Sequence, residues 1–194
     1  MRFPYYERLS ERQKRTYRRS DALPVLEVPG VEQLASLVAS LGGALAGADR
    51  RAVERVSRAL AREICVRLDV EPVDVRVLSA RPTGSFGELH GLYEPRGRRG
   101  GLVTVWMRTA ARREVVAFRT FLRTLVHELL HHLDYELLGL EETFHTEGFF
   151  RRESALVRRL LGEPAPAPPE GAARTAREAA PRRTVGSGSS GRRG

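Results

Sequence analysis

The chain has almost no cysteine, and it lacks any long run of apolar residues. Its single cysteine, Cys65, excludes an intramolecular disulfide and is predicted to be a small buried hydrophobic residue. No stretch approaches the roughly 18 consecutive apolar residues that a transmembrane helix needs. The first residues also lack the apolar run of a signal peptide. We therefore expect a cytoplasmic protein with no membrane partner.

Lysine is nearly absent too, and positive charge is concentrated at the two ends of the chain. Lys14 is the only lysine, so arginine supplies almost all of the basic side chains behind the net charge of +9. Residues 1–20 carry a net +5 and residues 163–194 a net +3, which leaves +1 for residues 21–162. Basic ends can attract acidic polymers. Nucleic acid is therefore an expected but weakly supported partner, because a general preference for arginine also explains the charge.

Composition divides the chain into three parts. Its 194 residues are enough for one domain with its own core. Residues 1–30 form a basic N-terminal segment, and residues 31–162 form the domain. Residues 163–194 are rich in Pro, Ala, Arg and Gly and contain a linker-like Gly–Ser run, so we predict that they are disordered.

Periodicity predicts helices first and strands afterwards. Apolar residues at helical spacing predict helices over residues 4–19, 31–41 and 49–68, with Asp49 as the N-cap of the third. Alternating or β-branched stretches predict strands over residues 73–78, 88–93 and 102–107. The glycine-rich turn 95–101 should join the last two as a hairpin. The expected fold class is α+β, with a small antiparallel sheet.

The most informative motif is His-Glu-Leu-Leu-His at residues 127–131, and four of the five histidines lie between 127 and 145. A helix brings residues four apart onto one face, so His127 and His131 can bind one metal ion from the same side. Glu128 lies about 100° round the helix from His127 and can flank the ion without binding it. Two neutral imidazoles as ligands and one carboxylate as general base are what metal-assisted hydrolysis requires.

The segment 114–138 gives this motif its helical context. An apolar stripe recurs at i, i+3 and i+4 spacing on the side roughly opposite the two histidines, through Phe118, Leu122, Leu125, Leu129 and Leu133. Gly139 is expected to end the helix. The helix would then pack its apolar side into a core and turn its histidines toward a cleft. The alternative is a pair of histidines on an ordinary solvated face.

A catalytic metal site needs a third protein ligand and an open fourth position for water. His145 is the best candidate, since it follows the Gly139 stop and precedes a second amphipathic helix over about residues 147–161. Glu147 and Glu153 are alternative third ligands. His145 could otherwise simply cap that second helix.

Several neighbouring residues could support the site. Asp134 lies one turn beyond His131, where it could orient a ligand imidazole, act as an extra ligand, or be a surface carboxylate. Tyr93 and Tyr135 could each donate a phenolic hydrogen bond to a developing oxyanion, or pack as ordinary aromatics. His132 falls toward the apolar side of the helix and should lie in the core.

These residues resemble the zincin metallopeptidases, and most closely their SprT-like and Wss1-like group. That group carries His-Glu-x-x-His on a helix, with an extended strand before it and, after a short connection, a further histidine followed by an aromatic residue. The matching features are a strand at residues 101–107 and the residues His127, Glu128, His131, His145 and Phe149, and the similarity covers about residues 85–160.

The resemblance implies a zincin-like fold, in which N-terminal helices and a small antiparallel sheet precede the metal helix and a C-terminal helix closes the domain. It also implies a hydrolase of the zinc metalloprotease type, with one Zn²⁺ per chain held by His127, His131 and His145. Glu128 would be the general base. A peptide or protein substrate could lie along strand 102–107, because an extended peptide can pair with a strand edge, or the strands could form a plain structural hairpin.

Two other functions stay open at this point. One is a zinc hydrolase that acts on a non-peptide amide or ester. The other is a non-catalytic binding module stabilised by zinc. Glu128 favours an enzyme, because a purely structural metal site has no need of a general base.

Overall fold

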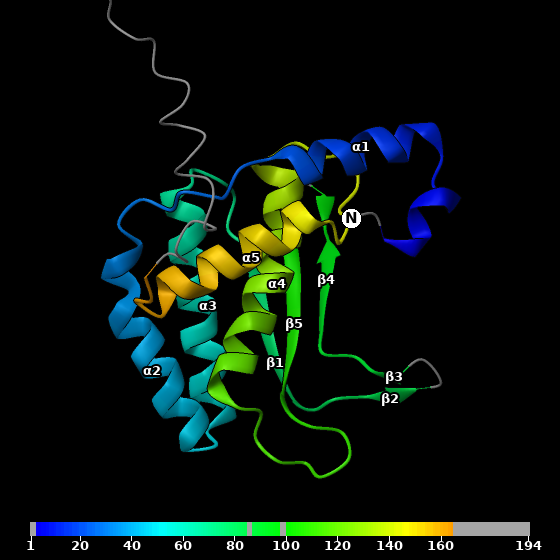
Figure 1. The fold of residues 1–194 in the computed structure, drawn as a ribbon. Helices are drawn as coiled ribbons and strands as arrows, with labels where there is room; N and C mark the ends of the chain where they lie inside the picture. The colour runs from blue at the N-terminus through cyan, green and yellow to red at the C-terminus, as the bar shows by residue number, and fades with distance from the viewer. Residues whose placement is uncertain (1–2, 85–86, 98–99, 165–194) are drawn as a thin grey trace, which may run out of the picture. The chain divides into compact units, whose positions relative to one another are not determined.

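The computed structural model describes residues 3–84, 87–97 and 100–164, all within one compact unit that covers residues 1–164. The fold is α+β. Its described part contains five α-helices, two short 3₁₀-helices and a three-stranded mixed sheet (Figure 1). None of the described helices combines the length and apolar character needed to cross a membrane. The predicted disorder of residues 163–194 concerns residues that lie almost wholly outside the described part.

The N-terminal segment contains two helices where one was predicted. The 3₁₀-helix η1 covers Pro4–Arg8 and α1 covers Glu11–Ala22. The single helix expected over residues 4–19 is wrong because Ser10 starts a new one. Its hydroxyl accepts a hydrogen bond from the Gln13 backbone N–H, and the Gln13 side chain accepts one from the Ser10 backbone N–H.

The next two helices form part of the core. The 3₁₀-helix η2 (Val31–Leu34) leads into α2 (Ala35–Ala46), which continues past the predicted end at residue 41. Leu45, with 2% of its surface exposed, explains the longer helix because its burial outweighs the low helix propensity of Gly42 and Gly43. Helix α3 covers Arg50–Arg67, and the predicted N-cap is confirmed, because the Asp49 side chain accepts from the Ala52 N–H at 3.0 Å. Cys65 is fully buried, as predicted.

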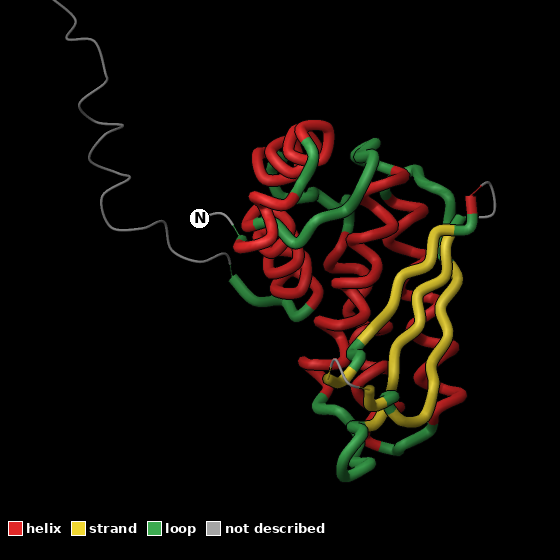
Figure 2. The backbone as a smooth tube through the Cα atoms, turned by 90° about the vertical axis from the view of Figure 1, so that its right-hand side faces the viewer, coloured by secondary structure: helices red, strands yellow, loops and turns green. Residues whose placement is uncertain are grey.

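The sheet is mixed, so the prediction of an antiparallel sheet is wrong in one pairing. The three-stranded sheet has the order β1 (Asp74–Ala80), β5 (Gly101–Arg108), β4 (Gly91–Pro95). Two short strands, β2 (Thr83–Gly84) and β3 (Gly87–Glu88), pair separately. The predicted β4–β5 hairpin is confirmed, but β5 pairs with β1 in parallel. The chain reverses once before β4 and again after it, which returns β5 to the direction of β1. Figure 2 shows the three strands side by side along one flank of the helices.

The two outer strands differ in how their free edges are covered. Arg58 donates to the Val75 carbonyl at 2.9 and 3.1 Å, and Arg50 donates to the Val77 carbonyl at 2.8 Å. The Val77 N–H donates to Glu54 at 2.9 Å. Side chains of α3 therefore occupy the outer edge of β1. Strand β5 is central, so the expected peptide site along residues 102–107 is wrong: both of its edges are already paired.

Helix α4 (Phe118–Glu136) packs against β4 and β5, and α5 (Glu147–Leu160) packs against α4. The predicted apolar stripe of α4 is confirmed, because Leu122, Leu125, Leu129 and Leu133 are each at most 1% exposed. The helix begins at residue 118 rather than 114, since the Val116 N–H still donates to the Met107 carbonyl of β5. Gly139 adopts a positive φ of 56° after the helix, as its role in ending α4 requires.

Candidate metal centre

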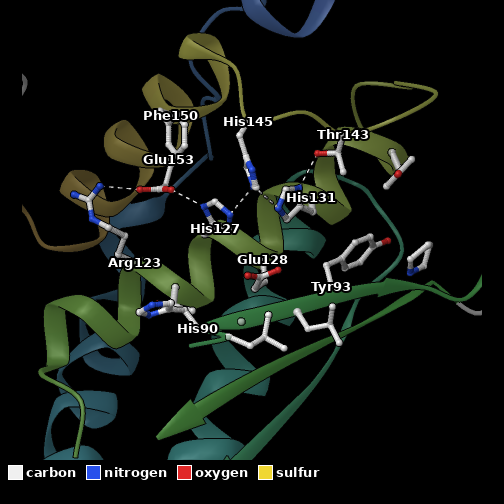
Figure 3. A pocket seen from close by; sticks show the side chains of 16 residues that line it. His90, Tyr93, Arg123, His127, Glu128, His131, Thr143, His145, Phe150 and Glu153 are labelled. Carbon is white, nitrogen blue, oxygen red and sulfur yellow. Dashed lines mark hydrogen bonds and ion pairs between the residues drawn. The ribbon is translucent and has the colours of Figure 1, made fainter. Parts of the chain in front are cut away.

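Three histidines converge at one point between α4 and the loop that follows it (Figure 3). His127 and His131 project from successive turns of α4, and the loop of residues 137–146 returns His145 toward them. Nε2 of His145 lies 2.9 Å from Nε2 of His127 and 3.2 Å from Nε2 of His131. A tetrahedral ion with bonds of about 2.0–2.1 Å to nitrogen holds its ligand atoms about 3.3 Å apart. The predicted convergence of the three rings is confirmed, and their spacing suits a metal ion.

The ring of His127 is oriented by a buried carboxylate. Its Nδ1 lies 2.8 Å from Oε2 of Glu153, and a carboxylate can only accept, so Nδ1 carries the proton and Nε2 offers a lone pair to the centre. The other oxygen of Glu153 accepts from Arg123 at 2.7 Å. Glu153 and Glu147, the alternative third ligands, both lie outside the metal-ligating group found among the described residues.

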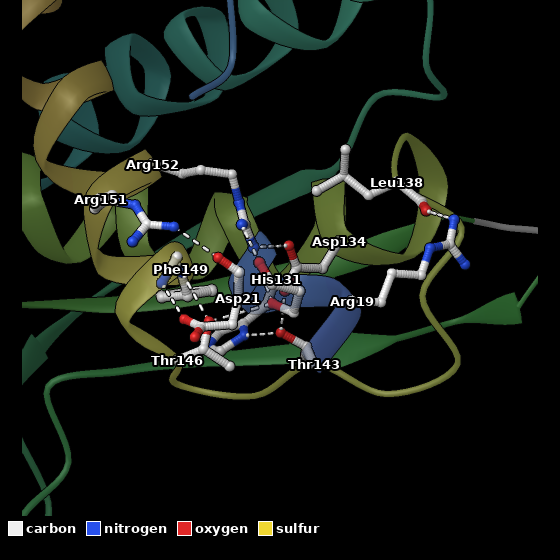
Figure 4. Close-up of polar contacts among 12 residues, drawn as sticks. Arg19, Asp21, His131, Asp134, Leu138, Thr143, Thr146, Phe149, Arg151 and Arg152 are labelled. Carbon is white, nitrogen blue, oxygen red and sulfur yellow. Dashed lines mark hydrogen bonds and ion pairs between the residues drawn. The ribbon is translucent and has the colours of Figure 1, made fainter. Parts of the chain in front are cut away.

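The ring of His131 is oriented through a hydroxyl. The Thr143 hydroxyl donates to Oδ2 of Asp134 at 2.8 Å, so its oxygen accepts from Nδ1 of His131, 2.7 Å away. Asp134 is fully buried and pairs with Arg152 at 3.0 Å (Figure 4). Asp134 therefore supports His131 indirectly. Nε2 of His131 is left unprotonated, like that of His127, and both lone pairs face Nε2 of His145.

An aromatic ring backs all three imidazoles. The Phe149 ring is fully buried, and its centroid lies 4.8–5.3 Å from those of His127, His131 and His145. Burial and the neighbouring imidazoles lower the pKa of His131 to about 3, and burial also lowers the pKa of His145. Both rings are thus held neutral near pH 7, which is the form that binds a metal.

Glu128 lines the same cleft, which has a volume of about 770 Å³. The side chain is 6% exposed, and burial raises its pKa to about 7, with His127 and the Tyr93 N–H opposing the shift. A carboxyl group with a pKa near 7 can both take up and release a proton at neutral pH. Its place depends on Gly91 of β4, because a Cβ added there would overlap the carboxylate.

We predict that Gly91→Ala displaces Glu128 while leaving the histidines in place. Because the added methyl group occupies the position of the carboxylate, the variant should bind the same amount of metal as the parent, and any hydrolysis that uses this carboxylate should be at least about tenfold slower. Gly43→Ala is the matched control, since a Cβ at Gly43 meets nothing within 4 Å. Metal analysis and steady-state kinetics on both variants check the prediction, and equal turnover in all three proteins would contradict it.

The two candidate oxyanion donors, Tyr93 and Tyr135, differ in their surroundings, and the surroundings of Tyr93 are set by His132. His132 is fully buried, as predicted, and its Nε2–H donates to the Glu71 carbonyl at 2.7 Å. Its Nδ1 therefore accepts from the Tyr93 hydroxyl at 3.2 Å, and burial raises the pKa of Tyr93 to about 12. The hydroxyl of Tyr93 points away from His127, His131 and His145 (Figure 3). Tyr135 stacks on Tyr93 and lines the cleft, so it is the phenol left for the expected role.

Some residues of the site carried no signal in the sequence. Thr143 lies in an irregular loop, where spacing predicts no contact. Leu89, Leu92 and Phe150 line the cleft although 42%, 39% and 37% of their surfaces are exposed, and His90 joins them. An apolar wall and a histidine cluster thus face the same space.

Comparisons of the chain with protein-family models, with curated protein sequences and with solved structures found no match. The arrangement of side chains in the cleft is therefore the basis for assigning a function.

Proposed function

We propose that this chain is a zinc-dependent metallopeptidase of the zincin type. The observation that carries the proposal is the meeting of three imidazole Nε2 atoms, two of them with their lone pairs fixed toward one point, in a cleft that also holds the buried Glu128 carboxylate. An all-imidazole donor set suits zinc. With three protein donors among the described residues, a fourth position is left for water, as catalytic sites require.

The residues of the cleft have distinct tasks in this reaction. When bound, the zinc ion acts as a Lewis acid that activates water and polarises the scissile carbonyl. Glu128 accepts a proton from the attacking water and returns one to the leaving amine. Glu153 and Thr143 keep the lone pairs of His127 and His131 directed at the centre. Tyr135 is the proposed donor to the developing oxyanion.

An open strand edge beside the cleft favours a peptide over a small amide or ester. In the described sheet, β5 is central and side chains of α3 bond to the outer edge of β1, which leaves the outer edge of β4 apart from the Tyr93 N–H that donates to Glu128. Residues 91–93 and 95 of that strand line the cleft. An extended peptide that pairs with β4 through backbone hydrogen bonds would pass in front of the histidines.

His145→Ala tests the proposal. Loss of one imidazole from a three-ligand site should reduce bound zinc from one equivalent to well below one, and it should abolish cleavage of an unfolded protein substrate. Elemental analysis and a peptide-hydrolysis assay measure the two effects. His90→Ala is the control, since His90 lines the cleft outside the metal-ligating group.

The same assays distinguish the competing functions. Hydrolysis of small amides or esters without any peptide cleavage would replace the peptidase by a different zinc hydrolase. One bound zinc without hydrolysis of either substrate class would identify a zinc-stabilised binding module. No bound zinc in the parent would reject the metal centre.

A further inference from the structure

The loop that carries His145 has little structure of its own. Residues 137–146 contain no helix or strand, yet they supply both Thr143 and His145 to the metal centre. Nδ1 of His145 has no hydrogen-bond partner among the described residues, unlike that of His127 or His131. The position of the His145 ring must therefore be fixed through its backbone and its packing.

Residues 3–22 of the N-terminal segment support this loop from outside (Figure 4). Arg19 donates to the carbonyls of Leu138 and Gly139 at 2.7 and 3.0 Å. The segment also bonds to the side chains of Glu141 and Glu142 and to the start of α5, through Arg12, Gln13, Ser20 and Asp21. These contacts flank His145 along the chain on both sides.

One contact of this segment reaches the third ligand itself. The Tyr5 hydroxyl donates to the backbone carbonyl of His145 at 3.0 Å. Phe3 packs against Phe150 at 6.0 Å between ring centroids, and Phe150 stacks on the His145 ring at 5.8 Å. The N-terminal segment thus holds the backbone of His145 by a hydrogen bond and its ring through a chain of aromatic contacts.

A second route leads from the same segment to His131. The fully buried Arg152 donates to the Ser20 carbonyl at 2.7 Å and to Asp134 at 3.0 Å. Asp134 accepts from Thr143, which in turn accepts from His131. The close approach of the helices at this point depends on Gly148, where a Cβ would lie 2.6 Å from the Ser20 carbonyl oxygen.

We infer that the N-terminal segment is a positioning element of the metal centre and that Tyr5 is its positioning residue for His145. The inference rests on the metal centre of the proposed function, but not on peptide hydrolysis. Basic residues that could have served an acidic polymer instead fix the loop: Arg12 and Arg19 both bond to it. Metal affinity should therefore depend on a segment that contributes no metal ligand.

Tyr5→Phe and Tyr6→Phe form the matched test in the full-length protein. Both remove one phenolic hydroxyl from η1, but the Tyr6 hydroxyl accepts from Arg18 of α1, whereas that of Tyr5 donates to His145. Tyr5→Phe should weaken zinc binding about tenfold in a competition with a chelator, and it should shift the visible absorption of the Co²⁺-loaded protein. Tyr6→Phe should change neither, and urea unfolding of the two metal-free variants should match within about 1 kcal/mol.

Each outcome of this test decides a separate question. Parent-like zinc affinity and an unchanged Co²⁺ spectrum in Tyr5→Phe would overturn the inference. Equal losses in Tyr5→Phe and Tyr6→Phe would overturn it too, because they would indicate general loosening of the fold. A parent that binds zinc but cleaves no peptide would reject the proposed function and leave the inference standing. A parent that binds neither Zn²⁺ nor Co²⁺ would reject both.

Discussion

Glu128→Gln should leave one zinc ion bound per chain and lower peptide turnover by about 10²–10⁴-fold. Glutamine keeps the shape of the side chain but cannot accept a proton, so the loss should be in kcat while KM changes little. The three imidazole ligands are untouched, so the metal stays. Steady-state kinetics together with elemental analysis measure the effect, and Glu136→Gln, an exposed position at the end of the same helix, is the control.

Glu128→Gln should also change how the stability of the metal-free protein depends on pH. Burial raises the pKa of Glu128 from 4.5 to about 7, so the folded state keeps a proton that the unfolded state releases. The stability this proton contributes is present below about pH 4.5 and is lost as the pH rises through 7. Between these values the metal-free parent should lose more stability than Glu128→Gln in urea unfolding.

In the kinetic test, parent-like peptide turnover by Glu128→Gln would remove the general-base assignment.

Arg152→Met should cost about 3–5 kcal/mol in the free energy of unfolding. Arg152 and Asp134 have fully buried side chains, so removal of the guanidinium leaves a carboxylate with no cation in a site that water cannot reach. The variant also loses the two bonds from Arg152 to Ser20, which tie α5 to the end of α1. Urea unfolding of the metal-free protein measures the loss.

Arg159→Met is the matched control, because Arg159 lies on the same helix and pairs with Glu27, which is 79% exposed. An exposed pair of this kind contributes about 0–1 kcal/mol. A similar loss in the two variants would mean that burial of the Asp134–Arg152 pair does not set its energetic importance. A loss below 1 kcal/mol in Arg152→Met would show that the pair is not needed for folding.

The sequence was most informative where one periodic helix carries the chemistry. The apolar stripe of α4 and the spacing of His127, Glu128 and His131 follow from 3.6 residues per turn, which any helix imposes. His145 could be predicted because the Gly139 stop lets the chain turn back toward the helix before the second amphipathic helix begins. The predicted hairpin of β4 and β5 follows from a glycine-rich turn between two apolar stretches.

Features that depend on distant parts of the chain could not be predicted in this way. The parallel pairing of β1 with β5 depends on where the chain turns between them, and alternation within each strand carries no information on direction. The contact of Thr143 with His131 depends on the path of an irregular loop. The role of Glu153 needed the angle between α4 and α5, because its spacing fits a ligand as well as a partner of His127.

The covered edge of β1 also restricts how this protein could associate with itself. A free strand edge is a template on which another copy can extend the sheet. Because Arg50, Glu54 and Arg58 already bond to the Val75 carbonyl and to both backbone groups of Val77, β4 is the less protected outer strand of the described three-stranded sheet. A peptide bound along β4 would cover that edge, so occupancy of the cleft should also reduce pairing of two copies through this strand.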